Sequence, residues 1–214
     1  MLSDIILYSV TYAKQIDWDL IVRRCREKAF VRKNVIFIVK SFERQEMVRG
    51  LCRSIHRLYP GTAIIIADDS RHPLQLNRPN VTVLHLPFNS GLGAGLAAAL
   101  EQVKTPYVMR MDDDELLSIR SRVHQELLYL KKHREVGFDP NIKVIDHDEF
   151  FWRAAGVIAS AAALNTVVFH RHNPYDRKYN TYRSDYENDL HYISTKKRRI
   201  LQNPSFPTRQ VYTG

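Results

Sequence analysis

The chain has 214 residues, of which 44% are hydrophobic and 26% are charged, which is ordinary for one folded domain with a small appendage. Only two cysteines, Cys25 and Cys52, are present, so the sequence gives no reason to expect a disulfide framework. No apolar run approaches the roughly 20 residues that a membrane span needs. The first residues also lack the basic start of a signal peptide. We therefore expect a cytoplasmic protein.

The net charge of +9 is unevenly distributed. Basic residues form a run at Lys196–Arg199 and crowd the segment Arg23–Lys33. Such clusters suit nucleic acid, an anionic membrane surface or a polyanionic substrate, although a solvated basic face explains them as well. The sequence has no helix-turn-helix pattern or RNA-stacking motif, so nucleic acid is the least favoured partner. Peripheral attachment to the inner face of the membrane, or to a synthesis complex, remains open.

After a helical extension over residues 1–33, apolar β-branched runs alternate with segments of helical spacing. This pattern predicts an α/β fold, with a mostly parallel sheet between two layers of helices. The segment Glu115–Glu135 has apolar residues at helical spacing and predicts one helix. The other expected elements are strands at Asn34–Val39, Thr62–Ala67, Val81–Leu86, Tyr107–Met111 and Val167–His170, and helices at Gln45–Tyr59, from Gly91 to about Val103, and at Asp189–Leu201.

Polar loops follow the first four predicted strands. They are Ser41–Arg44, Asp68–Ser70, Asn89–Gly95 and Asp112–Asp114. In an open α/β sheet the loops after the strands meet at one edge, so these four can share a ligand.

Three consecutive carboxylates, Asp112, Asp113 and Asp114, follow the strand that begins at Tyr107. Unshielded like charges repel one another, so a nearby cation makes such a cluster easier to maintain. If the strand end is extended, Asp112 and Asp114 point to one side and Asp113 to the other. The Asp112/Asp114 pair then predicts a site for a hard cation. A solvated acidic turn or a helix N-cap cluster is the alternative.

Other polar residues at these strand ends suit a nucleoside diphosphate. Asp68 and Asp69 can accept hydrogen bonds from ribose hydroxyls or a base N–H. Gly91 and the glycines at 93 and 95 would let the backbone approach a phosphate at a helix start, although close helix–sheet packing explains them equally well. Arg44 can neutralise a diphosphate, but a lone arginine is more often a surface residue.

These motifs resemble the nucleotide-binding half of GT-A glycosyltransferases of the family 2 type, and most of all the β-1,4-N-acetylgalactosaminyltransferase branch. The likeness covers roughly Asn34–His170. It implies a UDP-sugar donor, inversion at the anomeric carbon, and a Mn²⁺ or Mg²⁺ ion on Asp112 and Asp114. The motifs that carry it are Lys-Ser-Phe-x-Arg at 40–44, Ile-Ala-Asp-Asp-Ser at 66–70 and Arg-Met-Asp-Asp-Asp at 110–114. The residues that it assigns to the nucleotide sugar are Ser41, Phe42, Arg44, Asp68, Asp69, Asn89, Gly91 and Asp113.

The second half resembles the same branch. Gly-Phe-Asp-Pro at 137–140 and Asp-His-Asp-Glu-Phe-Phe at 146–151 are similar to the segment that carries the family's catalytic base. The resemblance implies Glu149 as the base, with Asp148 second. From the residues alone, a pair of acidic groups at a helix N-terminus explains them as well. His170 matches a position that can supply a further metal ligand, although a strand-end histidine is usually a surface residue.

One departure concerns the segment between the acidic triplet and Gly-Phe-Asp-Pro, which is much longer in the family. The acceptor side therefore looks abridged. We expect a metal-dependent inverting glycosyltransferase that acts on a polysaccharide or glycolipid acceptor. The alternative is a nucleotide-sugar-binding subunit without activity. The expected organisation is an extension at 1–33, a GT-A domain at 34–185 with a nucleotide-binding half (34–115) and an acceptor half (136–185), and a basic helix and tail at 186–214.

Overall fold

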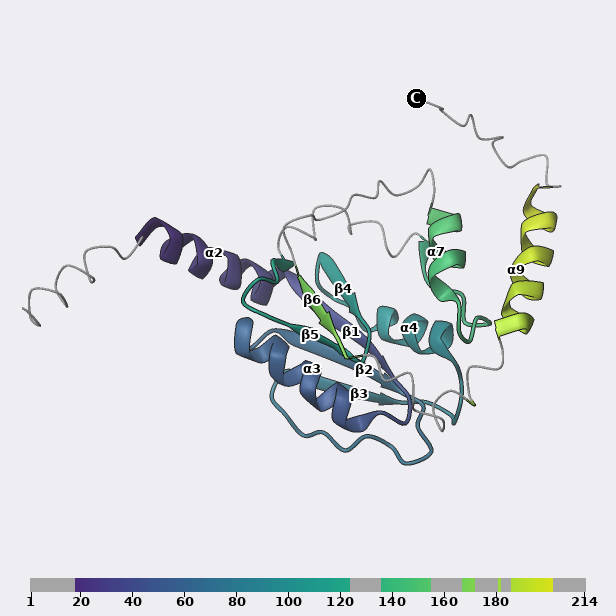
Figure 1. Ribbon diagram of the computed structural model, residues 1–214, viewed down its shortest axis with the longest axis horizontal. Helices are drawn as coiled ribbons and strands as arrows, with labels where there is room; N and C mark the ends of the chain where they lie inside the picture. Colours follow the sequence, from purple (N-terminus) through teal and green to yellow (C-terminus); the bar gives the residue numbers. More distant parts are fainter. Residues whose placement is uncertain (1–17, 124–135, 155–166, 172–180, 182–185, 202–214) are drawn as a thin grey trace, which may run out of the picture.

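The computed structural model describes residues 18–123, 136–154, 167–171, 181 and 186–201. Its centre is a parallel four-stranded sheet in the order β3-β2-β1-β4 (Figure 1). The expected strands are confirmed to within two residues at each end. They are β1 (Val35–Ser41), β2 (Ala63–Asp68), β3 (Val81–His85) and β4 (Tyr107–Met111).

The side chains of β1 alternate between two hydrophobic clusters, one on each face of the sheet. Val35, Phe37 and Val39 pack against α3 (Gln45–Leu58). Ile36 and Ile38 pack against α4 (Leu92–Glu101) on the opposite face. A strand buried on both faces needs a continuous apolar sequence, which is the pattern at 35–39. The three-layer α/β architecture expected from the sequence is therefore confirmed.

Residues 136–154 pack on the α4 face, beside the nucleotide-binding half. Phe138 stacks on Phe150 of α7 (Asp146–Ala154), with 5.1 Å between ring centroids, and both rings join the cluster around α4. The C-terminal helix α9 (Tyr186–Leu201) is joined to the start of α7 through Asp189, whose carboxylate accepts hydrogen bonds from the backbone N–H groups of residues 143–145. The basic terminal helix expected at Asp189–Leu201 thus begins three residues earlier.

A two-stranded antiparallel sheet lies beside the main one. It pairs β5 (Glu115–Leu117) with β6 (Val168–His170) (Figure 1). The prediction of one helix from Glu115 is therefore wrong over residues 115–122, where the strand is followed by a turn. Leu117 is buried against the α3 cluster, and its N–H donates to the hydroxyl of Ser54 on α3. A long-range partner strand has overridden the local helical spacing; residues 124–135 of the predicted helix lie outside the described part.

The N-terminal helix α2 (Trp18–Asn34) runs out from the body of the domain (Figure 1). Its C-terminal end is anchored by Val31, which is fully buried in the α3 cluster, and by Phe30, whose ring lies 5.8 Å from that of Tyr107. The helical character expected for the extension is confirmed over residues 18–34. Among the described residues, no helix is long and apolar enough to cross a membrane.

Candidate active site

The loops after β1 and β4 meet through Arg44, at the carboxyl edge of the sheet. One terminal nitrogen of Arg44 lies 2.9 Å from Asp113 Oδ1 and 3.0 Å from Asp114 Oδ2. All three side chains are buried. The fold therefore brings Arg44 together with two of the three carboxylates, as expected for strand ends in a parallel sheet. Arg44 is an internal cation, and the interpretation of it as a surface residue is wrong.

The acidic triplet is not extended. The N–H of Glu115 bonds to the carbonyl of Asp112, which closes a turn over residues 112–115. Asp113 and Asp114 therefore both face Arg44, whereas the Asp112 carboxylate pairs with Arg110 at 2.9 Å. The expectation that Asp112 and Asp114 share one side and oppose Asp113 is wrong, because the alternation of side chains ends where the strand does.

Asp113 has the strongest electrostatic perturbation in this loop. Burial raises the pKa of its carboxyl, and the charges of Asp114 and Asp112 raise it further. Arg44 opposes these effects, yet the pKa of Asp113 still reaches about 7. When both are ionised, Asp113 and Asp114 carry more negative charge than their shared Arg44 neutralises, so a further cation beside them would be stabilised.

Asp114 and His170 lie side by side, with Nε2 of His170 2.8 Å from Asp114 Oδ1. Two ligands in adjacent positions of an octahedral ion, each about 2.1 Å from it, lie about 3 Å apart. This pair of donors therefore fits a Mn²⁺ or Mg²⁺ ion as well as it fits a hydrogen bond. Asp112 would have to leave Arg110 to join them. Within the described segments, no three histidine, cysteine or acidic side chains converge on a metal position.

Asp68 and Asp69, at the end of β2, are nearly completely buried. The Asp68 carboxylate accepts hydrogen bonds from the Ser70 hydroxyl at 2.6 Å and the Leu74 N–H at 2.7 Å, so it holds the loop after β2. The Asp69 carboxylate binds the ammonium of Lys40 and the N–H of Gly91. Burial lowers the pKa of Lys40, and Asp69 partly opposes this effect.

The glycines before and within α4 allow close packing. A Cβ on Gly93 would collide with the backbone carbonyl oxygen of Asp139 and lie 2.8 Å from that of Ile142. A Cβ on Gly95 would collide with the aliphatic part of Lys40. The N–H of Gly93 donates to the Ile142 carbonyl, so a phosphate does not have free use of this helix start. Of the two interpretations left open by the sequence, the structure favours packing for Gly93 and Gly95.

An aromatic pair lies at the same edge of the sheet. The rings of Phe42 and Phe88 are 5.7 Å apart, and Phe88 is 43% exposed. Asn89, which follows Phe88, has a positive φ of 56° and donates its N–H to the Asp69 carbonyl. Ser41 ends β1, and its buried hydroxyl makes no hydrogen bond to the described residues. The predicted residues Ser41, Phe42 and Asn89 thus lie at the expected edge, and sequence reasoning missed Phe88.

Glu149 on α7 is 1% exposed and belongs to a separate ionic cluster. Its carboxylate lies 2.9 Å from Nη2 of Arg153 and 2.7 Å from Nζ of Lys196 on α9. Lys196 also binds Asp139. The Asp139 carboxyl is buried, which raises its pKa, but hydrogen bonds from Lys196 and Asn141 outweigh burial and lower the pKa to about 2. Asp148 lies in α7, and its side chain is outside the described part.

Sequence reasoning assigned no role to the cations that complete these two clusters, although two of them lie in the quoted motifs. They are Lys40, Arg110, Arg153 and Lys196. The guanidinium of Arg171 belongs to neither cluster, and it donates to the Met47 carbonyl and packs over Gly50. A lysine or arginine gives no local signal of which distant carboxylate it will meet. Gly50 did give a signal, because a glycine inside a predicted helix often marks a place where another group approaches the helix closely.

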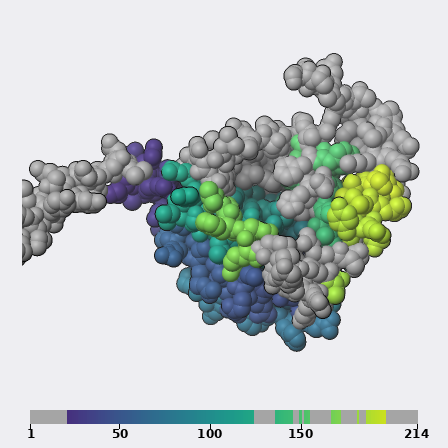
Figure 2. Space-filling view, viewed as in Figure 1, coloured from purple at the N-terminus to yellow at the C-terminus, as the bar shows by residue number. Residues whose placement is uncertain are grey.

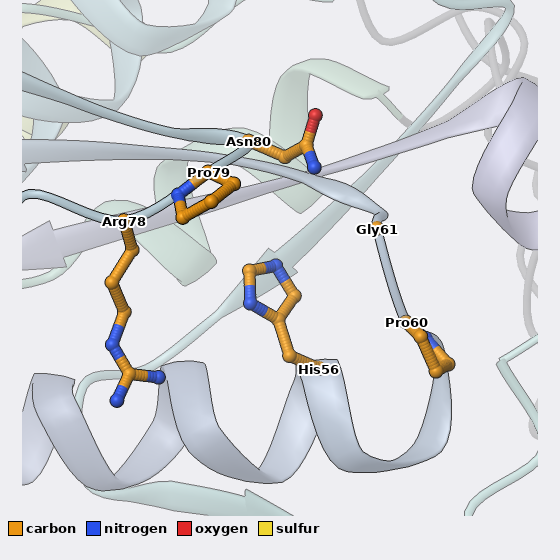
Figure 3. A pocket seen from close by; sticks show the side chains of 6 residues that line it. All are labelled: His56, Pro60, Gly61, Arg78, Pro79 and Asn80. Carbon is orange, nitrogen blue, oxygen red and sulfur yellow. The ribbon is translucent and has the colours of Figure 1, made fainter.

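A separate pocket lies at the other end of the sheet, where β2 and β3 begin (Figure 3). The end of α3 contributes His56, and the turns before the two strands contribute Gly61 and Arg78. The His56 ring is fixed by the Thr62 carbonyl, 2.9 Å from Nε2. This pocket is at the amino edge of the sheet, so it is not part of the carboxylate cluster at the carboxyl edge.

Comparisons with known proteins agree with this arrangement. The model of glycosyl transferase family 2 matches residues 36–199, which includes both carboxylate clusters and most of α9. Mouse β-1,4 N-acetylgalactosaminyltransferase 2 is 36% identical over 102 residues, which are 48% of this chain and 20% of that protein. The chain thus aligns with about a fifth of that relative's length.

Two solved structures share the fold at low sequence identity. The mannosyltransferase PcManGT from Pyrobaculum calidifontis, solved with GDP-Man and Mn²⁺, matches with a TM-score of 0.54 and 14% identity over 84% of this chain and 71% of its own. Residues 1–349 of S. aureus TarS match with a TM-score of 0.53 and 16% identity over 80% and 66% of the two chains. With the fold shared and the family model covering most of the sequence, this chain belongs to glycosyltransferase family 2, of the GT-A fold.

Proposed function

We propose that the protein is a metal-dependent inverting glycosyltransferase that moves a hexose or N-acetylhexosamine from a UDP-sugar to a polysaccharide or glycolipid acceptor. The observation that carries the proposal is the cluster at the strand ends. There, buried Asp113 and Asp114 share a single arginine, and Asp114 lies 2.8 Å from His170. Such an excess of negative charge suits a divalent cation, and a cation lets carboxylates and a diphosphate share a site.

The donor would lie across the carboxyl edge of the sheet. Phe42 and Phe88 offer an aromatic surface for the nucleobase, next to the loop that Asp68 organises. The buried Ser41 hydroxyl and the backbone around Asn89 and Gly91 complete this edge. Asp69 acts on the donor through Lys40 and Gly91, which it holds in place.

Asp114 and His170 would hold the ion, with Asp112 joining them after it leaves Arg110. The ion would supply positive charge to the departing UDP, as a Lewis acid does. Arg44 fixes the carboxylates from the protein side, so that their orientation is set before the donor arrives. In this role Arg44 positions ligands and does not itself neutralise the diphosphate.

Glu149 and Asp148 are the candidates for the base, in that order. In an inverting transfer the acceptor hydroxyl loses its proton to a carboxylate, its oxygen bonds to the anomeric carbon, and the bond from that carbon to UDP breaks. Glu149 is held by Arg153 and Lys196, so it can accept that proton only after one of these contacts opens. The same contacts favour the second candidate function, a nucleotide-sugar-binding subunit of a surface-polysaccharide synthesis complex without activity of its own.

A panel of UDP-sugars, with release of UDP as the readout, distinguishes the two functions. We expect release that depends on Mn²⁺ or Mg²⁺. Glu149→Gln should lower turnover by roughly 10²–10⁴-fold and leave the UDP affinity unchanged, because the base acts only in the transition state. Asp148→Asn is the matched variant one residue away. If it alone loses turnover, Asp148 is the base; UDP binding without turnover for every donor would support the inactive subunit.

A further inference from the structure

Helix α2 has two dissimilar sides. The side that faces the domain repeats at spacings of three and four residues through Arg24, Glu27, Val31 and Asn34, which are all at least partly buried. Val31 is fully buried, and Phe30 beside it contacts Tyr107. The orientation of the helix is therefore fixed by its C-terminal turns.

The side that faces away from the domain carries a row of exposed apolar and small side chains. Ile21 and Val22 are 40% and 43% exposed, and Cys25 and Ala29 are exposed as well. Their spacings of three, four and seven residues place all four on one face of the helix. Figure 2 shows α2 at the surface, extending beyond the body of the domain. This outer stripe, defined as Ile21, Val22, Cys25 and Ala29, has no partner of its own within the described residues.

Basic residues border the outer stripe on both flanks. Lys28 lies along one flank, with Arg32 one turn further on, where its aliphatic part approaches Gly61, and Arg26 and Lys33 lie along the other. All four are exposed. Glu27 is on the side toward the domain, where it pairs with Arg23 at 3.9 Å, and the only other acidic residue of α2 is Asp19 in its first turn. The outer face of α2 is thus an apolar centre between two rows of cations.

We propose that α2 docks this domain on an anionic lipid surface, with the outer stripe in the interface and the flanking cations on the headgroups. An apolar face bordered by lysine and arginine is what such a surface binds. A second copy of the chain fits less well, because pairing two outer stripes would bring like charges together on both flanks. Nucleic acid would leave the apolar centre without a use. This proposal goes beyond the proposed sugar transfer and does not depend on it.

The test is co-sedimentation of the full chain with two kinds of vesicle, phosphatidylcholine alone and a mixture with about a third phosphatidylserine. We expect binding to the anionic vesicles only, weakened by added salt. Lys28→Gln/Lys33→Gln should lower the partition coefficient at least about tenfold, since each basic residue near such a surface contributes about fivefold. Ile21→Ser/Val22→Ser should lower it as well, because it removes the apolar centre.

Arg53→Gln/Arg57→Gln removes two exposed cations from α3 and is the matched control, which should bind as the wild type does. Circular dichroism confirms that each variant is folded. The proposal is overturned if wild type ignores anionic vesicles, if it binds both kinds equally, or if the control loses as much binding as the α2 variants. Light scattering adds one further outcome. A wild-type dimer that Ile21→Ser/Val22→Ser dissociates would assign the outer stripe to a second copy instead.

Discussion

The two buried ionic clusters of this domain differ in their balance of charge. At the strand ends, the carboxylates outnumber the lysine and arginine side chains, and the pKa of Asp113 is raised to about 7. Around Glu149, two carboxylates meet two cations, and the pKa of Asp139 is lowered to about 2 although burial alone would raise it. An external cation beside the first cluster would be stabilised by its excess of carboxylates. The second is neutral within itself and fastens α7 to α9.

Replacing the cation of the first cluster should have the largest effect on stability. Arg44→Ala leaves Asp113 and Asp114 buried without their shared partner, which should lower the free energy of unfolding by about 3–5 kcal/mol at pH 8. Urea denaturation measures it. Arg49→Ala on α3 removes an exposed pair with Glu46 and a hydrogen bond to the Gln75 carbonyl, and should cost only about 1–2 kcal/mol. Equal losses in the two variants would mean that the strand-end cluster is not short of positive charge.

The close contact between α4 and the 139–142 turn can be tested by adding one methyl group to a glycine of α4. Gly93→Ala drives a Cβ into the backbone carbonyls of Asp139 and Ile142, which should cost about 1–3 kcal/mol. Gly95→Ala meets the aliphatic part of Lys40 and no backbone, so Lys40 must shift within its contact to Asp69 and the cost should be smaller. Thermal unfolding of both variants gives the comparison. Equal stabilities would contradict the close approach of the 139–142 turn to α4.

The second cluster should reveal itself in the pH dependence of stability. The pKa of Asp139 is about 2 in the folded protein, below the usual 3.8 of an aspartate carboxyl. Its stabilising effect is therefore fully present above about pH 4 and is lost as the pH falls toward 2. Asp139→Asn should lower the free energy of unfolding by about 2 kcal/mol at neutral pH, with a difference that vanishes near pH 2.

Lys196→Met is the companion to that variant, because Lys196 makes the contact that lowers the Asp139 pKa most. This variant should reduce the loss of unfolding free energy that Asp139 causes between about pH 4 and pH 2. Parallel pH curves for wild type and Asp139→Asn, measured by urea denaturation at each pH, would show that the second cluster does not depend on this charge.

The sequence was sufficient for the parts of the fold that depend on local pattern. Runs of β-branched residues such as Val35–Val39 predict strands because a strand buried on both faces admits few other side chains. The grouping of the loops after the strands could also be predicted, because the strand ends of a parallel sheet share an edge. Two predictions failed where the structure is decided by distant contacts. Glu115–Leu117 pairs with β6, and the turn at Asp112 redirects Asp113 and Asp114 toward Arg44.

The roles of individual carboxylates also could not be predicted from the sequence. Asp68 and Glu149 are equally plausible as ligands or as structural groups until their partners are known. The partners are a backbone N–H at Leu74 for Asp68, and Arg153 and Lys196 for Glu149. No local pattern announces such contacts, because they join segments that are far apart in the chain.

Titration calorimetry of UDP, with and without Mn²⁺, tests the central claim most directly. We expect micromolar-to-millimolar affinity in the presence of the ion and none without it, because the diphosphate and the carboxylates of the strand-end cluster otherwise repel each other. Asp114→Ala should abolish the metal-dependent binding. Asp139→Asn, which alters only the second cluster, should keep it. UDP binding of equal strength with and without Mn²⁺, in wild type and in Asp114→Ala alike, would contradict the assignment of the metal and nucleotide site.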